Sequence, residues 1–358
     1  MQPTDRVERL LEELSNASGP SGFEGPVREI VARELRGQGL EVSTDGLGSV
    51  IGVLRGSSGG PRIMLAAHMD EVGAMVRFVT PEGMVKFQLL GGWLDQALVD
   101  QRWTILTRKG PLTAISGLRS VHITPADDRN RVTLRDDVFL DVGARSKDEA
   151  EALGVHAGDP IVPAVAFTEI ADRRYTGKAM DDRVGCVMLL ETLRRLKEQG
   201  SKTPNTIYFV GTVQEEVGLR GAHTAAQAIK PDLGISLEAG IAADHPGGRP
   251  DWAQERLGAG PVVYLADAAM LVNLRLRDSH YAGSNYDDFF RKTTQVAKVI
   301  CIHNAMVVKG DIRAVRRPGT AGNQDLIPFN SNPFALNLHC VRIQKQRATL
   351  IDGNLVTF

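Results

Sequence analysis

The chain has 358 residues, of which 42% are hydrophobic and 24% are charged, and its formal net charge is −1. This length is enough for one large domain or two, and the composition is that of a globular protein with a buried core. A net charge so close to zero excludes bulk electrostatic attraction to nucleic acid or to an anionic membrane. We therefore expect neither nucleic acid nor a membrane among its partners.

The three cysteines are Cys186, Cys301 and Cys340, which lie far apart and show no metal-ligand spacing. An odd number of distant cysteines suits a reducing compartment and provides no disulfide framework. The N-terminus lacks the basic and apolar segments of a signal peptide, and no apolar run approaches the roughly 20 residues of a membrane span. These features together predict a cytoplasmic protein.

The first 70 residues read as a mixture of helices and strands. Apolar residues at helical spacing predict helices around residues 7–14 and 27–35, the second with Pro26 in its first turn. Strand-like runs follow at residues 49–54 and 63–67, separated by a glycine- and serine-rich turn.

From residue 72 to residue 163 the pattern changes to short β-rich runs. We predict strands at the runs 74–79, 84–89, 103–107 and 138–142, and a single helix at 147–153. Several short strands at close spacing are typical of a small barrel or sandwich. Because the α/β pattern returns afterwards, we interpret residues 72–163 as an inserted β-rich domain.

After residue 175 helices and strands alternate again. Helices are predicted at 184–196 and 222–229, and near-continuous apolar strands at 206–213 and 233–237. This alternation favours a layered, doubly wound α/β domain with parallel strands. We assign residues 1–71 and 164–358 to this domain, although residues 279–358 lose the clear periodicity and contain no glutamate.

The apolar strand ending near residue 67 leads directly into His68, Met69 and Asp70. If the strand continued, His68 and Asp70 would point to the same face, an arrangement that orients an imidazole for metal binding. The alternative is a polar strand end at which the one histidine has its hydrogen bonds satisfied and binds no metal. Three acidic clusters downstream favour the metal site.

Each of these clusters lies next to a predicted element. Asp181 and Asp182 precede a helix, Glu215 and Glu216 follow one apolar strand, and Glu238 follows the next. The carboxyl ends of parallel strands meet at one edge of a sheet, where open α/β folds place their sites. Hard carboxylates with an imidazole suit zinc, cobalt or manganese, and a spare glutamate suits a general base.

Four segments resemble the TET-type aminopeptidases, a family of glutamyl and deblocking aminopeptidases in which some members are labelled endoglucanases. They are Ala66–Gly73, Gly177–Arg183, Gln214–Gly218 and Glu238–Ala242. The resemblance covers roughly residues 5–278. It implies a dinuclear metallo-aminopeptidase that cleaves short peptides one N-terminal residue at a time, with the inserted domain forming dimers that assemble into dodecamers.

The resemblance also implies a role for each site residue. His68 would bind the first metal and Asp70 would orient it, while Asp181 would bridge two ions. Glu238 would complete the first site, and Glu216 would bind the second. Glu215 would be the general base.

The family's closing Gly-Gly-Thr-Asp-Ala and Tyr-Ile-His-Ser segments are absent after residue 278, and with them the histidine that closes the second site. His303 is a candidate replacement, with His280 and His339 behind it. A frame change or fusion near residue 279 would explain the atypical tail. The atypical tail leaves open a catalytically defective oligomeric relative. The endoglucanase label of some family members leaves open a second alternative, an endoglucanase-type glycoside hydrolase.

Overall fold

The computed structural model describes residues 6–117, 119–171, 173–200, 202–248, 256–258, 260–266, 299–303, 341–344 and 347–350, with only the backbone from residue 262 onward. The chain divides into two compact units, one formed by residues 1–240 and 263–304 and the other by residues 241–262 and 305–358. In the second unit, β16 (Val341–Gln344) pairs antiparallel with β17 (Arg347–Leu350). None of the helices in the described part of the chain has the length and apolar character needed to cross a bilayer.

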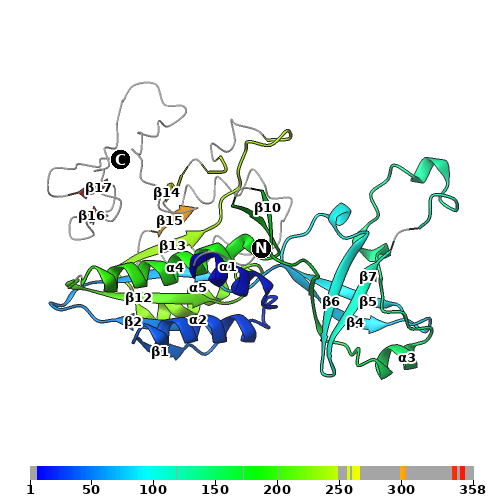
Figure 1. The fold of residues 1–358 in the computed structure, drawn as a ribbon, viewed down its shortest axis with the longest axis horizontal. Coiled ribbons are helices and arrows are strands. Elements are labelled where there is room, and N and C mark those ends of the chain that lie inside the picture. The colour runs from blue at the N-terminus through cyan, green and yellow to red at the C-terminus, as the bar shows by residue number, and fades with distance from the viewer. Residues whose placement is uncertain are drawn as a thin grey trace. The chain divides into compact units, whose positions relative to one another are not determined.

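The larger unit contains a mixed seven-stranded sheet (Figure 1). Its spatial order is β1 (Glu41–Thr44), β2 (Val50–Leu54), β12 (Asn205–Thr212), β3 (Gly60–His68), β13 (Leu233–Glu238), β15 (Val299–His303) and β14 (Val262–Ala266). Strands β12, β3, β13 and β15 run parallel to one another. Strand β2 is antiparallel to both β1 and β12, so the expectation of parallel strands is wrong for β1 and β2.

The helices that belong with this sheet are α1 (Arg6–Asn16), α2 (Gly25–Gly37), α4 (Met180–Glu198) and α5 (Arg220–Ile229). Helix α2 has proline at its first turn, as the sequence predicts. Helix α5 buries Ala225 and Ile229 against Ile51, Met64 and Val210. In α4 the residues from Gly185 to Leu190 are all buried and carry no charge, which matches a helix segment enclosed by protein on most sides.

Residues 73–163 form a closed six-stranded barrel. Its strands follow one another around the barrel as β4 (Gly73–Val79), β5 (Val85–Leu90), β8 (Leu140–Asp141), β7 (Gly110–Ser116), β6 (Gln101–Thr107) and β9 (Pro160–Pro163). One helix, α3 (Lys147–Ala152), accompanies it. A core that includes Trp103, Ile105 and Ile161 fills its interior. Closure leaves no unpaired edge between these strands.

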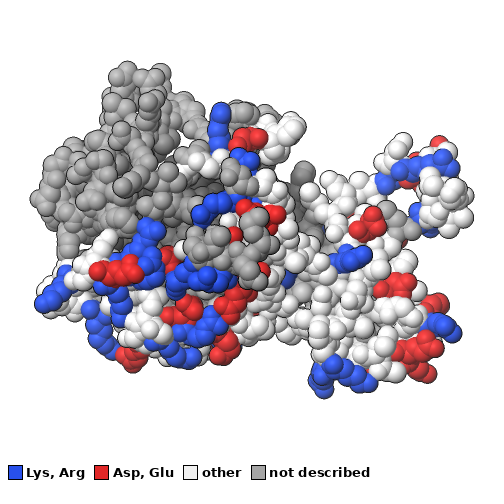
Figure 2. All heavy atoms as spheres, in the orientation of Figure 1, with Lys and Arg blue, Asp and Glu red and all other residues white. Residues whose placement is uncertain are grey.

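The sequence analysis missed β1, β7 and β9, the short hairpin after the barrel, and β14 to β17, and it extended the strand at β8. Strand β7 alternates strictly in burial, but its exposed positions include Ile115 and its buried ones include Ser116, so its hydrophobicity does not follow that alternation. Strand β9 begins and ends with proline, a residue that usually argues against a strand. A hairpin of β10 (Thr168–Ala171) and β11 (Arg174–Thr176) follows the barrel. On the surface shown in Figure 2, positive and negative side chains are interspersed.

Candidate metal centre

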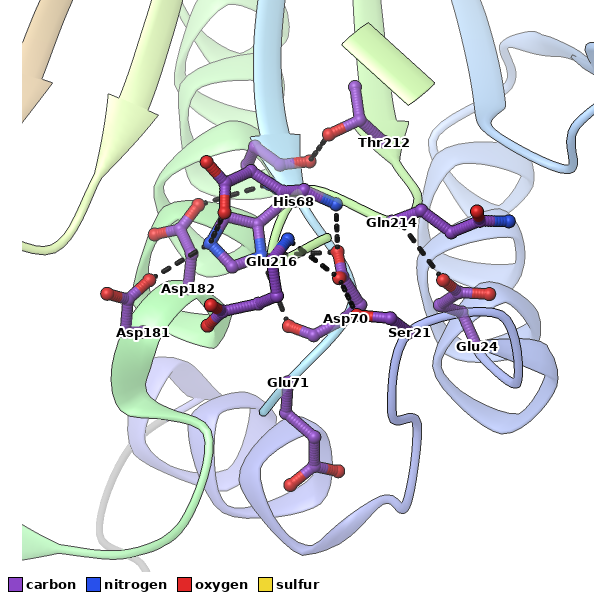
Figure 3. A network of polar contacts seen from close by, with 12 residues as sticks. Ser21, Glu24, His68, Asp70, Glu71, Asp181, Asp182, Thr212, Gln214 and Glu216 are labelled. Atoms are coloured by element: carbon purple, nitrogen blue, oxygen red, sulfur yellow. Dashed lines mark hydrogen bonds and ion pairs between the residues drawn. The ribbon is translucent and has the colours of Figure 1, made fainter. Parts of the chain in front are cut away.

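Three neighbouring parallel strands deliver polar residues to one edge of the sheet. Strand β3 ends at His68, β12 ends at Thr212 and β13 ends at Glu238, and the register pairs Thr212 with His68. The edge is the one at which open α/β sheets place their sites. Figure 3 shows the resulting network around His68.

His68 is at the centre of this network, with only 3% of its side chain exposed. Its Nε2 lies 2.9 Å from Asp181 Oδ1, 3.5 Å from Glu238 Oε1 and 3.9 Å from Glu215 Oε2. These three carboxylates come from segments that are far apart in the sequence. Their convergence on one imidazole nitrogen creates a small space surrounded by negative charge.

Asp70 lies on the other side of the ring, in the loop just after β3. Its Oδ1 is 3.4 Å from His68 Nδ1, while its backbone carbonyl is 3.1 Å from the same nitrogen. The strand therefore ends before Asp70, which corrects the expectation of a continuous strand. A loop turn, and not strand alternation, brings the carboxylate to the ring.

Asp70 also organises the loop after β12. Its two carboxylate oxygens accept the backbone N–H groups of Glu215 (2.9 Å) and Glu216 (3.1 Å), and Ser21 Oγ donates to it at 2.6 Å. Burial would raise the pKa of Asp70, but the hydrogen bond and charge of His68, helped by the hydrogen bonds from Ser21 and from the backbone of Glu215, hold that pKa below its usual range. One buried carboxylate thus links the histidine to both glutamates.

Glu24, the residue just before helix α2, supports the same loop. Its carboxylate accepts the backbone N–H of Gln214 at 3.1 Å and of Gly22 at 2.7 Å. Gln214 has a φ of 54°, so the chain turns sharply just before the two glutamates. Burial raises the pKa of Glu24, and the neighbouring charge of Asp70 adds to that effect.

The adjacent aspartates have different environments. Asp181 exposes 63% of its side chain, whereas Asp182 is fully buried. Asp182 Oδ2 accepts the backbone N–H of His68 at 3.2 Å, and its Oδ1 accepts that of Gly185 at 2.9 Å. Both residues have non-helical backbone angles at the start of α4, which turns the two carboxylates to different partners.

The electrostatics of the cluster are unfavourable without a cation. Burial would lower the pKa of His68, but hydrogen bonds to Asp181, Asp70 and Glu238 raise it well above its usual range. Burial, together with the charges of Glu238 and Asp181, raises the pKa of Asp182 well above its ordinary value. The pKa of Glu215 is also raised, chiefly by burial. The pKa of Glu216 rises to about 7, again chiefly through burial.

Two sets of donor atoms in the described residues are close enough to hold a divalent ion. One consists of His68, Asp182 and Glu238, and the other of His68, Asp181 and Glu216; in each set the atoms lie within 4.8 Å of one another. Imidazole and carboxylates are ligands that zinc, cobalt and manganese accept. Buried carboxylates with raised pKa values would also gain from a bound cation.

The structure therefore brings together every residue that the sequence analysis placed in the site. It adds Ser21 and Glu24, to which no role had been given, and it shows Asp182 accepting backbone N–H groups, where the sequence had suggested only that the neighbour of a bridging aspartate could orient the backbone or a ligand. The Asp181–Asp182 doublet was itself a visible signal for Asp182. No sequence signal identified Ser21 or Glu24, because both act across long stretches of chain.

His303, the candidate replacement ligand, is the last residue of β15. The register of β13 and β15 pairs it with Glu238, at the same edge of the sheet. The other candidates, His280 and His339, lie outside the described residues. A role for His303 thus stays a prediction.

A buried ion-pair network fixes the two segments that carry the site. Glu71, directly after Asp70, is 1% exposed and accepts two hydrogen bonds from Lys178 Nζ, at 2.8 and 3.0 Å. Arg183 Nη2 lies 3.4 Å from the same carboxylate, and the Arg183 side chain is fully buried. Burial lowers the pKa of Lys178. The network ties the loop after β3 to the start of α4.

Replacing Lys178 with methionine is expected to lower the free energy of unfolding by about 3–5 kcal/mol. The substitution removes one partner of a buried pair and leaves the Glu71 carboxylate poorly compensated. Urea unfolding followed by circular dichroism measures this change. The matched control is Lys147→Met, which breaks an exposed pair with Glu151 at 3.6 Å and should cost less than about 0.5 kcal/mol. Equal effects of the two substitutions would contradict the structural role of the network.

Comparison with known proteins gives concordant matches. Residues 48–285 match the family model described as M42 glutamyl aminopeptidase. Lysyl aminopeptidase from Pyrococcus furiosus is 34% identical over 270 residues, which are 75% of this chain and 75% of that protein.

Solved structures agree with the sequence matches. A TET aminopeptidase from a marine sediment archaeon of the Thaumarchaeota is 37% identical with a TM-score of 0.75, and the match covers 84% of this chain and 88% of that one. PhTET1-12s, a dodecamer, is 27% identical with a TM-score of 0.67; here the match covers 84% of this chain and 91% of that one.

Proposed function

Because this chain belongs to the M42 glutamyl aminopeptidase family of hydrolases, we propose that it is a metal-dependent aminopeptidase which removes N-terminal residues from short peptides. The observation that carries the proposal is the convergence of Asp181, Glu215 and Glu238 on one nitrogen of His68. Such a cluster of negative charge fits divalent cations.

The donor atoms suit two divalent ions per protomer, with zinc first and cobalt or manganese as alternatives. His68 and Glu238 would hold the first ion, Glu216 the second, and Asp181 would bridge them. Both oxygens of Asp182 already accept backbone N–H groups, which supports Asp181 as the bridge. When bound, such a pair of ions supplies Lewis-acid activation of the peptide carbonyl and of a water molecule.

Glu215 is the proposed general base. Its side chain is 26% exposed and its Oε2 is 3.9 Å from His68 Nε2. Burial raises its pKa, which makes its carboxylate a stronger base. It would take a proton from the attacking water and then give it to the leaving amine. Asp70 would act by positioning, since it orients the His68 ring and anchors the backbone of Glu215.

Metal binding is expected to depend on pH because Glu216 must lose a proton before it can act as a ligand. With its pKa at about 7 in the metal-free protein, protons compete below pH 7, and the apparent affinity for cobalt should rise about tenfold for each pH unit there. His68, whose pKa is also raised, changes the affinity in the same direction.

Calorimetric titrations with cobalt at pH 5.5, 6.5 and 7.5, in buffers of different ionisation enthalpy, measure both the affinity and the protons released. The Glu216→Gln variant should release fewer protons and should show a weaker pH dependence. Equal affinity of the original protein at pH 5.5 and 7.5 would contradict the assignment of Glu216.

Metal content per protomer tests the dinuclear site directly. Elemental analysis after incubation with zinc or cobalt should give close to two ions, with His303→Ala lowering this number if His303 closes the second site. One ion or none would support the alternative of a catalytically defective oligomeric relative. That alternative rests on the atypical tail, where the match to the family model ends at residue 285.

The glycoside hydrolase alternative has less support from the geometry. Hydrolysis of a glycosidic bond needs two carboxylates on opposite sides of a sugar ring, about 5–10 Å apart. Here the carboxylates of Asp181, Glu215 and Glu238 gather around a single point at His68. Hydrolysis of carboxymethylcellulose that survives chelation of metals would favour the alternative.

We further propose a layered, doubly wound catalytic domain of residues 1–71 and 164–358, with residues 72–163 as the inserted oligomerisation domain. Side chains alternate along β2, so Gly52, which faces Leu35 of α2, and Ile51, which faces α5, support helices on both faces of the sheet. The closed barrel at residues 73–163 supports the insertion.

A homo-oligomer, as a dimer or a dodecamer, is the proposed assembly, and short peptides are the proposed substrates. The barrel region carries exposed apolar side chains such as Leu94, Ile123 and Leu134, each more than 60% exposed. Apolar surface of this kind marks contact sites between proteins. We also propose that the protein is cytoplasmic. Light scattering of the purified protein measures the size of the assembly.

A further inference from the structure

A cavity of about 280 Å³ lies next to the candidate metal centre and has no part in the chemistry described above. Its walls include Val72, Trp93, Trp103, Pro163 and Val165, and Lys178 lies at its polar end. The volume is near the lower limit of small-molecule pockets, about 300 Å³, and is enough for one large side chain.

The cavity adjoins the residues proposed to hold the metals. Val72 follows Asp70 by two residues and packs against Gly91, where an added Cβ would lie 2.7 Å from Val72 Cγ1. The same Cβ would lie 3.3 Å from Glu216 Oε2. A single residue without a side chain, Gly91, therefore lies between the cavity wall and the Glu216 carboxylate.

The cavity is lined by the partly buried Trp93 and by Trp103 of the barrel core, which is only 2% exposed, and the polar atoms of both rings have partners elsewhere. Trp93 Nε1 donates to the backbone carbonyl of Gly73 at 3.2 Å, and Trp103 Nε1 donates to Ser116 Oγ at 3.0 Å. The two ring centroids are 5.3 Å apart. Aromatic walls of this kind favour aliphatic and aromatic side chains.

The charged groups of the cavity are also engaged. Lys178 Nζ uses its three donors on the carbonyl of Ala17 at 2.8 Å and on both oxygens of Glu71. Glu71 Oε1 accepts the backbone N–H of Gly19 as well. A charged side chain that entered the cavity would have to compete for these groups, and burial of an unpaired charge is unfavourable.

We infer that this cavity binds an apolar side chain of the peptide substrate, from a residue that flanks the scissile bond, and discriminates against lysine and glutamate there. The inference rests on the proposed aminopeptidase function and names its substrate class. A cavity of this kind should favour leucine or phenylalanine over lysine or glutamate by about 10–200-fold in kcat/KM.

Two peptide series test the inference. One varies the first residue among leucine, phenylalanine, lysine and glutamate, and the other varies the second residue in the same way. Exactly one of the flanking positions should show the apolar preference, and the series that shows it identifies the residue bound. No preference in either series would overturn the inference.

The variant Val165→Glu places a carboxylate in the cavity wall, at a position that is 42% exposed and can tolerate it. It should reduce cleavage of the leucine and phenylalanine peptides and increase that of the lysine peptide in the responsive series. Val132→Glu is the matched control, because Val132 is 51% exposed and does not line the cavity. Equal effects of the two variants would contradict the assignment.

Binding of free amino acids separates this inference from the proposed function. Phenylalanine, leucine and lysine are titrated into the cobalt-incubated protein, and calorimetry and the fluorescence of its three tryptophans, two of which line the cavity, are recorded. Phenylalanine should bind more tightly than lysine, and Val165→Glu should reverse that order. This result without cleavage of any peptide would overturn only the proposed function, whereas equal binding of phenylalanine and lysine would overturn the cavity assignment.

Discussion

Replacement of Glu215 with glutamine is expected to lower kcat by about 10²–10⁴-fold while the metal content stays unchanged. Glutamine keeps the size of the side chain but cannot accept the proton of the attacking water. The loop itself should persist, because Asp70 binds the backbone N–H of residue 215 and not its side chain. Peptide hydrolysis and elemental analysis of the same preparation measure the two quantities.

The control for this experiment is Glu151→Gln, on the exposed surface of α3. It should leave both kcat and metal content as they are. A Glu215→Gln protein with unchanged kcat would exclude Glu215 as the general base. A loss of bound metal in the same variant would instead show that Glu215 is a ligand.

Replacement of His68 with alanine is expected to remove both metals and to lower peptide hydrolysis by at least about 10³-fold. His68 belongs to both sets of potential ligands among the described residues, and its Nε2 lies 2.9 Å from Asp181, the proposed bridge, so its loss removes a ligand of the first ion and also weakens the second site. Metal ions supply several kcal/mol of transition-state stabilisation, and about 4 kcal/mol corresponds to a factor of 10³ in rate.

Elemental analysis gives the number of ions per protomer in the His68→Ala variant. His122→Ala serves as the control, since His122 is exposed and remote in sequence from the four motifs. Near-normal zinc content and activity in the His68→Ala protein would contradict a metal site at this edge of the sheet. Circular dichroism of both variants shows whether the fold is retained.

Much of the fold was accessible from the sequence because its pattern is local. Apolar spacing identified α1, α2, α4 and α5, and the apolar runs identified β3, β12 and β13, which together support a mixed α/β fold. The change of pattern at residue 72 indicated the β-rich region that forms the closed barrel. The domain boundaries themselves stay a proposal.

The order of the strands was not accessible in the same way. Strand β12 lies between β2 and β3, although some 150 residues separate it from them in the sequence. The antiparallel direction of β2 against β12 depends on contacts between segments that are distant in the sequence. No local pattern records such a pairing.

By itself, the sequence determined which residue types meet at the site, because His68, Glu215, Glu216 and Glu238 all follow apolar strands whose ends meet at one edge. Only the tertiary structure decided how Asp181 and Asp182 divide their roles. Backbone angles at the start of α4 direct one carboxylate to His68 Nε2 and the other to two backbone N–H groups.

The supporting contacts were likewise decided by the tertiary structure. Ser21 reaches Asp70 and Lys178 reaches Glu71, each across many residues of chain. The fold also sets Trp93 and Trp103 of the barrel region beside Lys178 in the lining of one cavity. Hydrogen bonds and ion pairs of this kind depend on distance and burial in space, which a sequence does not contain. The sequence shows which chemical groups the chain carries and which of them are neighbours along it. The fold decides which of the distant groups lie close enough to act together.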